Sequence, residues 1–89
     1  MRFQWDPDKA RRNARKHGIR FADAVTALED DSALTVEDNG EGERRWVTLG
    51  MDLVGRILVV AYSWRGDEIR IISARKAGPE ERREYGIKK

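Results

Sequence analysis

The chain has 89 residues, of which 38% are charged and 39% are hydrophobic, and its formal net charge is +2. This length excludes a two-domain enzyme, a dinucleotide-binding sheet and a solenoid, so we expect residues 1–89 to form a single domain. Because the sequence contains no cysteine and one histidine, it excludes disulfide scaffolds, thiol nucleophiles and the usual zinc sites, and we expect no metal or other cofactor.

Charge is distributed unevenly along the chain. Residues 1–20 carry a net charge of +5, residues 21–64 a net charge of −6 and residues 65–89 a net charge of +3. Basic ends of this kind indicate a surface that faces a polyanion. The longest apolar run, residues 57–62, is far too short to span a membrane, and the N-terminus lacks the apolar core of a signal peptide. We therefore expect a cytoplasmic protein that does not associate with a membrane.

The N-terminal part is predicted to contain one short strand and two helices. Alternation of Phe3 and Trp5 with polar residues indicates a strand. Asp6 and a following proline are typical of a helix start, and we expect this helix to reach about His17, where a glycine can end it. A second helix is predicted over residues 21–28, where apolar residues recur at positions i, i+3, i+4 and i+7.

The rest of the chain is predicted to form strands and one short helix. Strands are expected at residues 33–37, 44–51, 56–64 and 68–74, a polar loop at residues 38–43, and a helix from residue 79 to about residue 85. The last three strands are joined by short connections that contain glycine, which is typical of an antiparallel meander. The expected order is β-α-α-β-β-β-β-α, an α+β domain with helices laid on an antiparallel sheet.

The last predicted strand carries the strongest functional signal. Arg70 lies between isoleucines, and strict alternation places it on the strand face opposite Ser73. Ser73, Arg75 and Lys76 follow at the end of the strand. Three cations and a hydroxyl suit a phosphodiester, because arginine binds phosphate with two parallel hydrogen bonds and stays charged. The simpler alternative is an arginine that lies along the sheet edge, with the other cations in solvent.

Other candidate residues lie outside this strand. Arg65 is expected in the preceding hairpin turn, at the opposite end of the strand from Arg75, which indicates a groove along the sheet. His17 could act as a general acid or base, or it could cap and pack its helix. Three further candidates, Glu81, Arg82 and Tyr85, lie on the last helix. The positive N-terminus of that helix is by itself a sufficient structural reason for Glu81. Tyr85 could pack in the core or stack on a base.

Several short motifs resemble the BrnT-type toxins, the ribonuclease half of a bacterial type II toxin–antitoxin pair. The most specific are the run from residue 16 to 18, Lys-His-Gly, and the run from residue 70 to 75, Arg-Ile-Ile-Ser-Ala-Arg. Weaker matches extend the resemblance over residues 3–85. The resemblance implies a RelE-like fold, RNA cleavage and inhibition of translation. It also implies a tight complex with a ribbon-helix-helix antitoxin, expected as a 2:2 assembly, that binds operator DNA.

Our leading hypothesis is a metal-independent endoribonuclease in which a ribose 2′-hydroxyl attacks the adjacent phosphorus. Arg70, Arg75 and Lys76 would stabilise the charge that develops on the phosphorane. His17 and Glu81 both stay open as the general base, with Arg65, Ser73, Arg82 and Tyr85 expected to bind RNA. The alternatives are a nucleic-acid-binding module without catalysis, whose cations only neutralise phosphates, and a purely regulatory partner of another protein.

Overall fold

A computed structural model describes residues 2–38 and 44–88 of the chain. The elements follow the predicted order: β1 (Arg2–Gln4), α1 (Pro7–His17), α2 (Phe21–Leu28), β2 (Leu34–Asp38), β3 (Arg45–Met51), β4 (Ile57–Arg65), β5 (Glu68–Lys76) and α3 (Pro79–Lys88). The α+β fold class is therefore confirmed. Most of the expected polar loop, residues 39–43, lies outside the described residues. No helix within the described ranges is long and apolar enough to cross a membrane.

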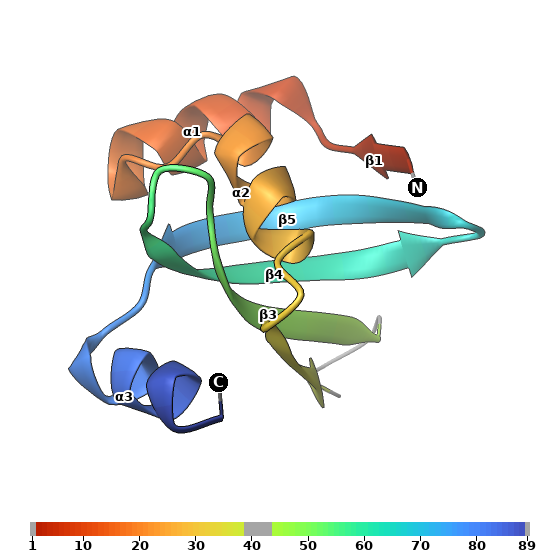
Figure 1. Ribbon diagram of the computed structural model, residues 1–89. Helices are drawn as coiled ribbons and strands as arrows, with labels where there is room; N and C mark the ends of the chain where they lie inside the picture. Colours follow the sequence, from red (N-terminus) through yellow and green to blue (C-terminus); the bar gives the residue numbers. More distant parts are fainter. Residues whose placement is uncertain (1, 39–43, 89) are drawn as a thin grey trace.

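The five strands form one sheet in the order β1-β5-β4-β3-β2 (Figure 1). Strands β2 to β5 pair in antiparallel fashion, as the meander predicted. The prediction of a purely antiparallel sheet is wrong at one edge, because β1 pairs with β5 in parallel. The two intervening helices and three strands carry the chain back to this edge, so the parallel pairing needs no tight turn.

Helices cover both sides of the sheet, and Figure 1 shows α1 and α2 on one side and α3 on the other. The main core lies under α1 and α2, where Ile19, Phe21 and Ala24 pack on Leu58, Val60 and Ile71 of the sheet. Gly50 lets α2 approach β3 closely, since a Cβ atom there would lie 2.3 Å from the carbonyl oxygen of Ala27.

A smaller cluster lies under α3. Tyr85 and Ala77 pack there against Leu49, with Ile57 and Val59 beside them. Helix α3 sits over the end of the sheet where β4 begins and β5 ends, and it leaves the end near the β4–β5 turn without a helix (Figure 1). One face of the sheet is therefore only partly covered.

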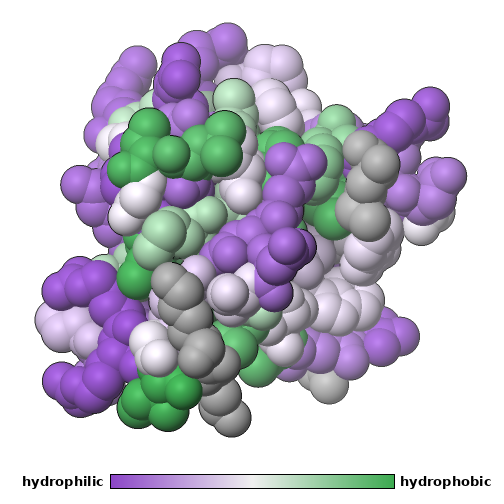
Figure 2. Space-filling view, in the orientation of Figure 1, coloured by the Kyte–Doolittle hydropathy of each residue, from purple (hydrophilic) through white to green (hydrophobic). Residues whose placement is uncertain are grey.

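Helix α1 is anchored by a single amide side chain. Asn13 is buried, and its Nδ2 atom donates to the carbonyl oxygens of Ile19 at 2.9 Å and of Ala74 at 2.8 Å. The backbone N–H of Ala74 donates in return to Asn13 Oδ1 at 3.1 Å. Asp6 caps the start of the helix and Gly18, with φ of +72°, ends it, as the sequence predicted. The remaining surface of α1 is basic, and Figure 2 shows hydrophilic residues over this part of the molecule.

Candidate functional site

A register shift in β5 decides which side chains share the partly covered face of the sheet, on the α3 side, which we call the open face. Ala61 pairs with Ser73 and Tyr62 pairs with Ile71, so Ile72 has no partner in the β4 register. Alternation therefore changes phase here, as it does at a β-bulge. Ala74 is consequently buried in the main core, whereas strict alternation predicted it beside Arg70. Ser73 lies instead on the same face as Arg70, so the predicted split between them is wrong.

Arg70 lies half-buried in the middle of this face. It is opposite Ser63 of β4 and Gln4 of β1 in the strand register. The nearest carboxylate along the strand, Glu68, is taken by Arg2 and by the Gln4 amide, which donates to it at 2.6 Å. Within residues 2–38 and 44–88, Arg70 thus has no carboxylate partner, and its charge is available to a ligand.

Ser63 is a second hydroxyl on this face that sequence reasoning missed. Its side chain is buried, and Oγ has no hydrogen-bond partner among the described residues. A buried hydroxyl without a partner costs free energy, which a ligand or water oxygen can recover. A polar residue in an apolar strand, opposite an arginine, was the signal in the sequence.

Arg75 and Glu81 form a bidentate ion pair at the end of β5. The two guanidinium nitrogens of Arg75 donate to Oε1 and Oε2 of Glu81 at 2.8 and 2.9 Å. Glu81 Oε1 also accepts the backbone N–H of Gly78 at 2.8 Å. This last bond is half of a capping box, since Glu81 is the third residue of α3 and reaches back to the residue before the helix. One carboxylate therefore caps α3 and ties it to β5.

These two sets of donors change the chemistry of Glu81. The hydrogen bond from Arg75, followed by the bond from the Gly78 amide, lowers the pKa of Glu81 from 4.5 to about 2. A carboxylate with so low a pKa is a weak proton acceptor at neutral pH. The geometry thus suits Glu81 to positioning Arg75 better than to general base catalysis.

Lys76 and Arg65 lie at opposite ends of β5, and only Arg65 shares the sheet face of Arg70. Lys76 pairs with Leu58, a residue of the main core, so it lies on the α1 side of the sheet at the end of β5. Arg65 pairs with Glu68 beside the β4–β5 turn, at the far end of the same hairpin. The cations therefore follow the length of β5 and do not converge on one point.

His17 is the last residue of α1 and is half-buried. It lies one helical turn after Asn13, on the same helix face. Since Asn13 is bonded to Ala74, this face looks toward the C-terminal end of β5. His17 therefore lies near the end of β5 on the α1 side of the sheet, as Lys76 does, whereas Arg75 pairs with Val59 and lies on the α3 side.

Two residues of α3 have different surroundings. Arg82 is exposed, and its Nη1 atom donates to the carbonyl oxygen of Ala77 at 2.9 Å. Tyr85 is only 3% exposed, and its hydroxyl donates to Asp30 Oδ2 at 2.5 Å. This bond and burial raise the pKa of Tyr85 to about 12. The ring is packed in the smaller cluster, so the structure favours core packing over base stacking for Tyr85.

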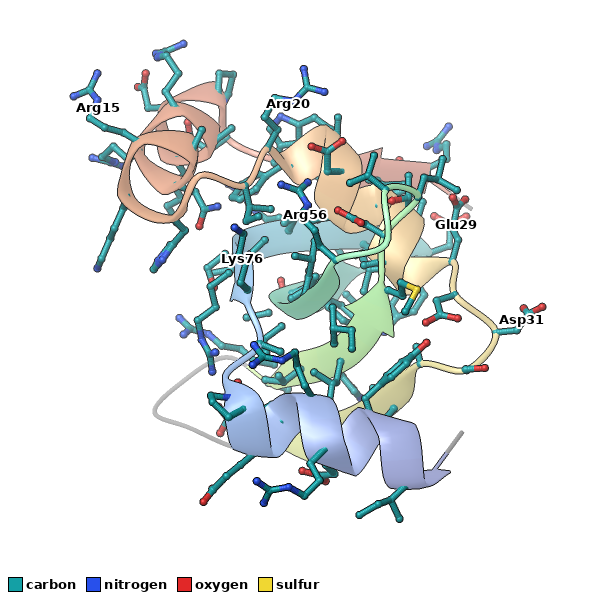
Figure 3. All side chains as sticks on the ribbon, turned by 60° about the vertical axis from the view of Figure 1, so that its left-hand side comes forward. Arg15, Arg20, Glu29, Asp31, Arg56 and Lys76 are labelled. Atoms are coloured by element: carbon teal, nitrogen blue, oxygen red, sulfur yellow. The ribbon has the colours of Figure 1, made fainter. Side chains whose placement is uncertain are left out.

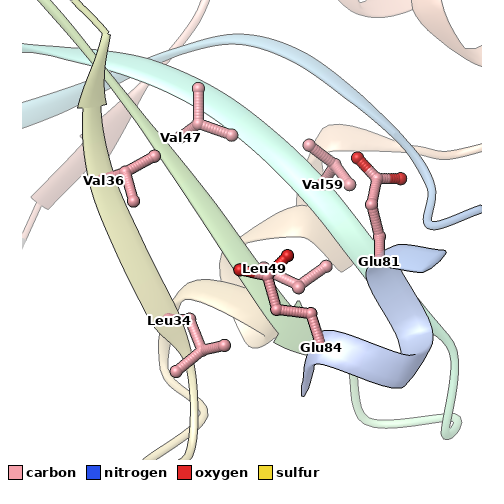
Figure 4. Close-up of a pocket in the computed structure, with 7 residues that line it drawn as sticks. All are labelled: Leu34, Val36, Val47, Leu49, Val59, Glu81 and Glu84. Carbon is pink, nitrogen blue, oxygen red and sulfur yellow. The ribbon is translucent and has the colours of Figure 1, made fainter. Parts of the chain in front are cut away.

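An apolar pocket of about 140 Å³ lies beside α3 on the partly covered face. Its walls are aliphatic side chains of β2, β3 and β4, and Figure 4 shows two glutamates of α3 at its rim. The lining residues are Leu34, Val36, Val47, Leu49, Val59, Glu81 and Glu84. Val36 is 64% exposed, so part of this apolar surface is open.

Comparison with known proteins places these features in a family. A family model described as the ribonuclease toxin, BrnT, of type II toxin–antitoxin systems matches residues 5–81. The chain is also similar to the crystal structure of the Brucella abortus ribonuclease toxin, BrnT, with 28% sequence identity and a TM-score of 0.71. That similarity covers 88% of this chain and 97% of the other chain. No curated protein matches the sequence. The resemblance noted from the motifs is confirmed, whereas its RelE-like detail stays a prediction.

The Arg75–Glu81 pair predicts a pH-dependent stability. Because the folded-state pKa of Glu81 lies below its ordinary value, the pair stabilises the fold above about pH 4.5 and this stabilisation is lost as the pH falls toward 2. Side-chain exposures of 45% and 33% allow solvent screening, so we expect Glu81→Gln to cost about 0.5–1 kcal/mol at pH 7. Urea unfolding measured from pH 7 to pH 2 should show this difference shrinking with the pH. Glu80→Gln, one residue earlier in the same helix turn, is the matched control, and an equal loss in both variants would contradict the assignment.

Proposed function

The chain belongs to the BrnT family of ribonuclease toxins of type II toxin–antitoxin systems, and we propose that it is a metal-independent endoribonuclease whose cleavage of RNA inhibits translation. Residues 1–89 would act as one catalytic domain. The observation that carries this proposal is Arg70, a half-buried cation in the middle of an open sheet face with no carboxylate partner among the described residues. Such a group is suited to an anionic ligand, because its charge is not already compensated.

In the proposed reaction a ribose 2′-hydroxyl attacks the adjacent phosphorus. The bond from phosphorus to the 5′-oxygen breaks and this oxygen takes a proton from solvent, which leaves a cyclic phosphate and a free 5′-hydroxyl. Arg70 stabilises the charge that builds on the phosphorane oxygens, and Ser73 donates to the same group. Arg75, which Glu81 holds in place, lies farther along β5 and stabilises negative charge on the RNA there.

We propose His17 as the general base that removes the 2′-hydroxyl proton. Glu81, the alternative, is occupied by Arg75 and the Gly78 amide. His17 lies at the helix end that faces the end of β5, and imidazole is the side chain best matched to proton transfer near neutral pH.

Replacement of Arg70 tests the charge-stabilising role. We expect Arg70→Ala to lower single-turnover cleavage of RNA in EDTA by about 10²-fold, as the loss of one such group does elsewhere. The melting temperature should change little, because Arg70 has no ion pair to lose within the described chain. Arg12→Ala, an exposed residue of α1, is the control and should cleave like the parent. RNA that stays intact with the parent protein until Mg²⁺ is added would contradict metal independence, and a gel shift without new RNA ends would indicate a binding module.

Replacement of His17 separates the two candidate bases. His17→Asn should lower the cleavage rate by about 10²-fold and remove the acidic limb of the pH–rate profile, since the proton acceptor is lost. Glu81→Gln should lower the rate but keep the limb, because it disturbs only the position of Arg75. The measurement is the single-turnover rate from pH 5 to pH 9. A limb that disappears with Glu81→Gln and persists with His17→Asn would reverse the assignment.

We also propose that a ribbon-helix-helix antitoxin neutralises the chain by covering the open sheet face and α3, in a 2:2 complex that binds operator DNA. The apolar pocket beside α3 and the cations along β5 support this surface, because apolar contacts supply lasting affinity and charge speeds encounter.

Expression of the chain alone should arrest growth, and co-expression of the adjacent open reading frame should restore it. Unaffected growth at high soluble levels of the chain alone would contradict the toxin assignment.

A further inference from the structure

A second cationic surface lies at the end of β5, where the sheet ends between the α1 side and α3. It is a hollow of about 240 Å³ formed where the β3–β4 loop, the end of β5 and the first turns of α3 meet. Its lining residues are Gly55, Arg56, Ile57, Lys76, Ala77 and Arg82. Figure 3 shows Lys76 and Arg56 close together between α1 and α3. Three cations from three elements thus border one hollow.

The charge of Arg56 is compensated within the protein. Its Nε atom donates to Asp52 at 2.8 Å and its Nη2 atom to Asp23 at 3.2 Å. Asp52 is buried and also accepts the backbone N–H of Val54 and of Arg56, so this network holds the loop in place. Arg56 is therefore a fixed part of the wall of the hollow, and the net positive charge of the hollow comes from Lys76 and Arg82.

Lys76 and Arg82 have no carboxylate partner among residues 2–38 and 44–88. The bond from Arg82 Nη1 to the Ala77 carbonyl fixes the guanidinium but does not reduce its charge. The closest glutamate of α3, Glu81, is already paired with Arg75. The hollow thus presents two uncompensated positive charges, and the guanidinium that carries one of them is held in a fixed orientation.

We propose that this hollow binds a backbone phosphate of the RNA farther along the strand than the scissile one, so that the RNA passes from Arg70 along β5 and round its end. The inference rests on the proposed function, and it moves Lys76 from charge stabilisation in the reaction to substrate binding. Cations that continue along one strand and round its end suit a chain of phosphates, since each phosphate needs its own partner. The oxygens of a phosphodiester can accept hydrogen bonds both from the ammonium group of Lys76 and from the paired N–H groups of the Arg82 guanidinium.

The test uses a single-stranded 2′-O-methyl oligonucleotide, which binds but has no 2′-hydroxyl to attack. Fluorescence anisotropy over a series of salt concentrations gives its affinity for the full chain. Lys76→Met, which keeps the apolar stem, and Arg82→Ala should each weaken binding by about five- to tenfold and reduce the salt slope by about 0.7, the value for one lost phosphate contact on a single strand. Arg83→Ala removes the same charge from the neighbouring exposed position of α3 and should bind like the parent.

The outcomes separate this inference from the proposed function. Equal affinities for the Lys76, Arg82 and Arg83 variants would overturn the inference, as would a parent chain that does not bind the oligonucleotide. Variants that lose affinity for the antitoxin alone would also overturn it and identify a protein-binding surface. If the Lys76 and Arg82 variants lose oligonucleotide affinity but the parent never cleaves unmodified RNA, the phosphate site stands and the endoribonuclease proposal fails.

Discussion

The bonds between Asn13 and Ala74 are the constraint on which the site depends. Strand β1 pairs only with residues 68–70 of β5, so the backbone of β5 beyond that point has no neighbouring strand on this side. Buried backbone groups must be paired, and the Asn13 amide offers one donor and one acceptor, as a strand would. A third bond to Ile19 fixes the chain after α1. The same side chain thereby holds the C-terminal end of α1 against the edge of β5.

Strand β5 carries the candidate site because it contributes side chains to the main core, to the open face and to the contact with α3. Ile69 and Ile71 pack under α1 and α2, the open face carries Arg70 and Ser73, and the strand end is joined to α3 through Arg75. The phase change at Ile72 makes this possible, since it keeps Ala74 in the core while Ser73 moves to the open face. One strand can then serve the core and a ligand surface at once.

Pairing with carboxylates divides the cations around the candidate site into a compensated and an uncompensated group. Arg56 and Arg75 are bonded to carboxylates that hold a loop and a helix in place. Arg70, Lys76 and Arg82 have no such partner among the described residues. All three lie on or next to β5. That arrangement suits an extended polyanion, whose phosphates repeat along a line.

The sequence by itself determined the order of the elements, the α+β class and the family, because hydrophobic periodicity, helix caps and short motifs are local features. It also located Arg70 and the cations that follow it on the last strand. Only the tertiary structure decided the parallel pairing of β1, the face of Ser73, the burial of Tyr85 and the pairing of Glu81 with Arg75. Each of these depends on contacts between distant residues or on a one-residue register shift, and a shift of one residue turns every following side chain to the other face.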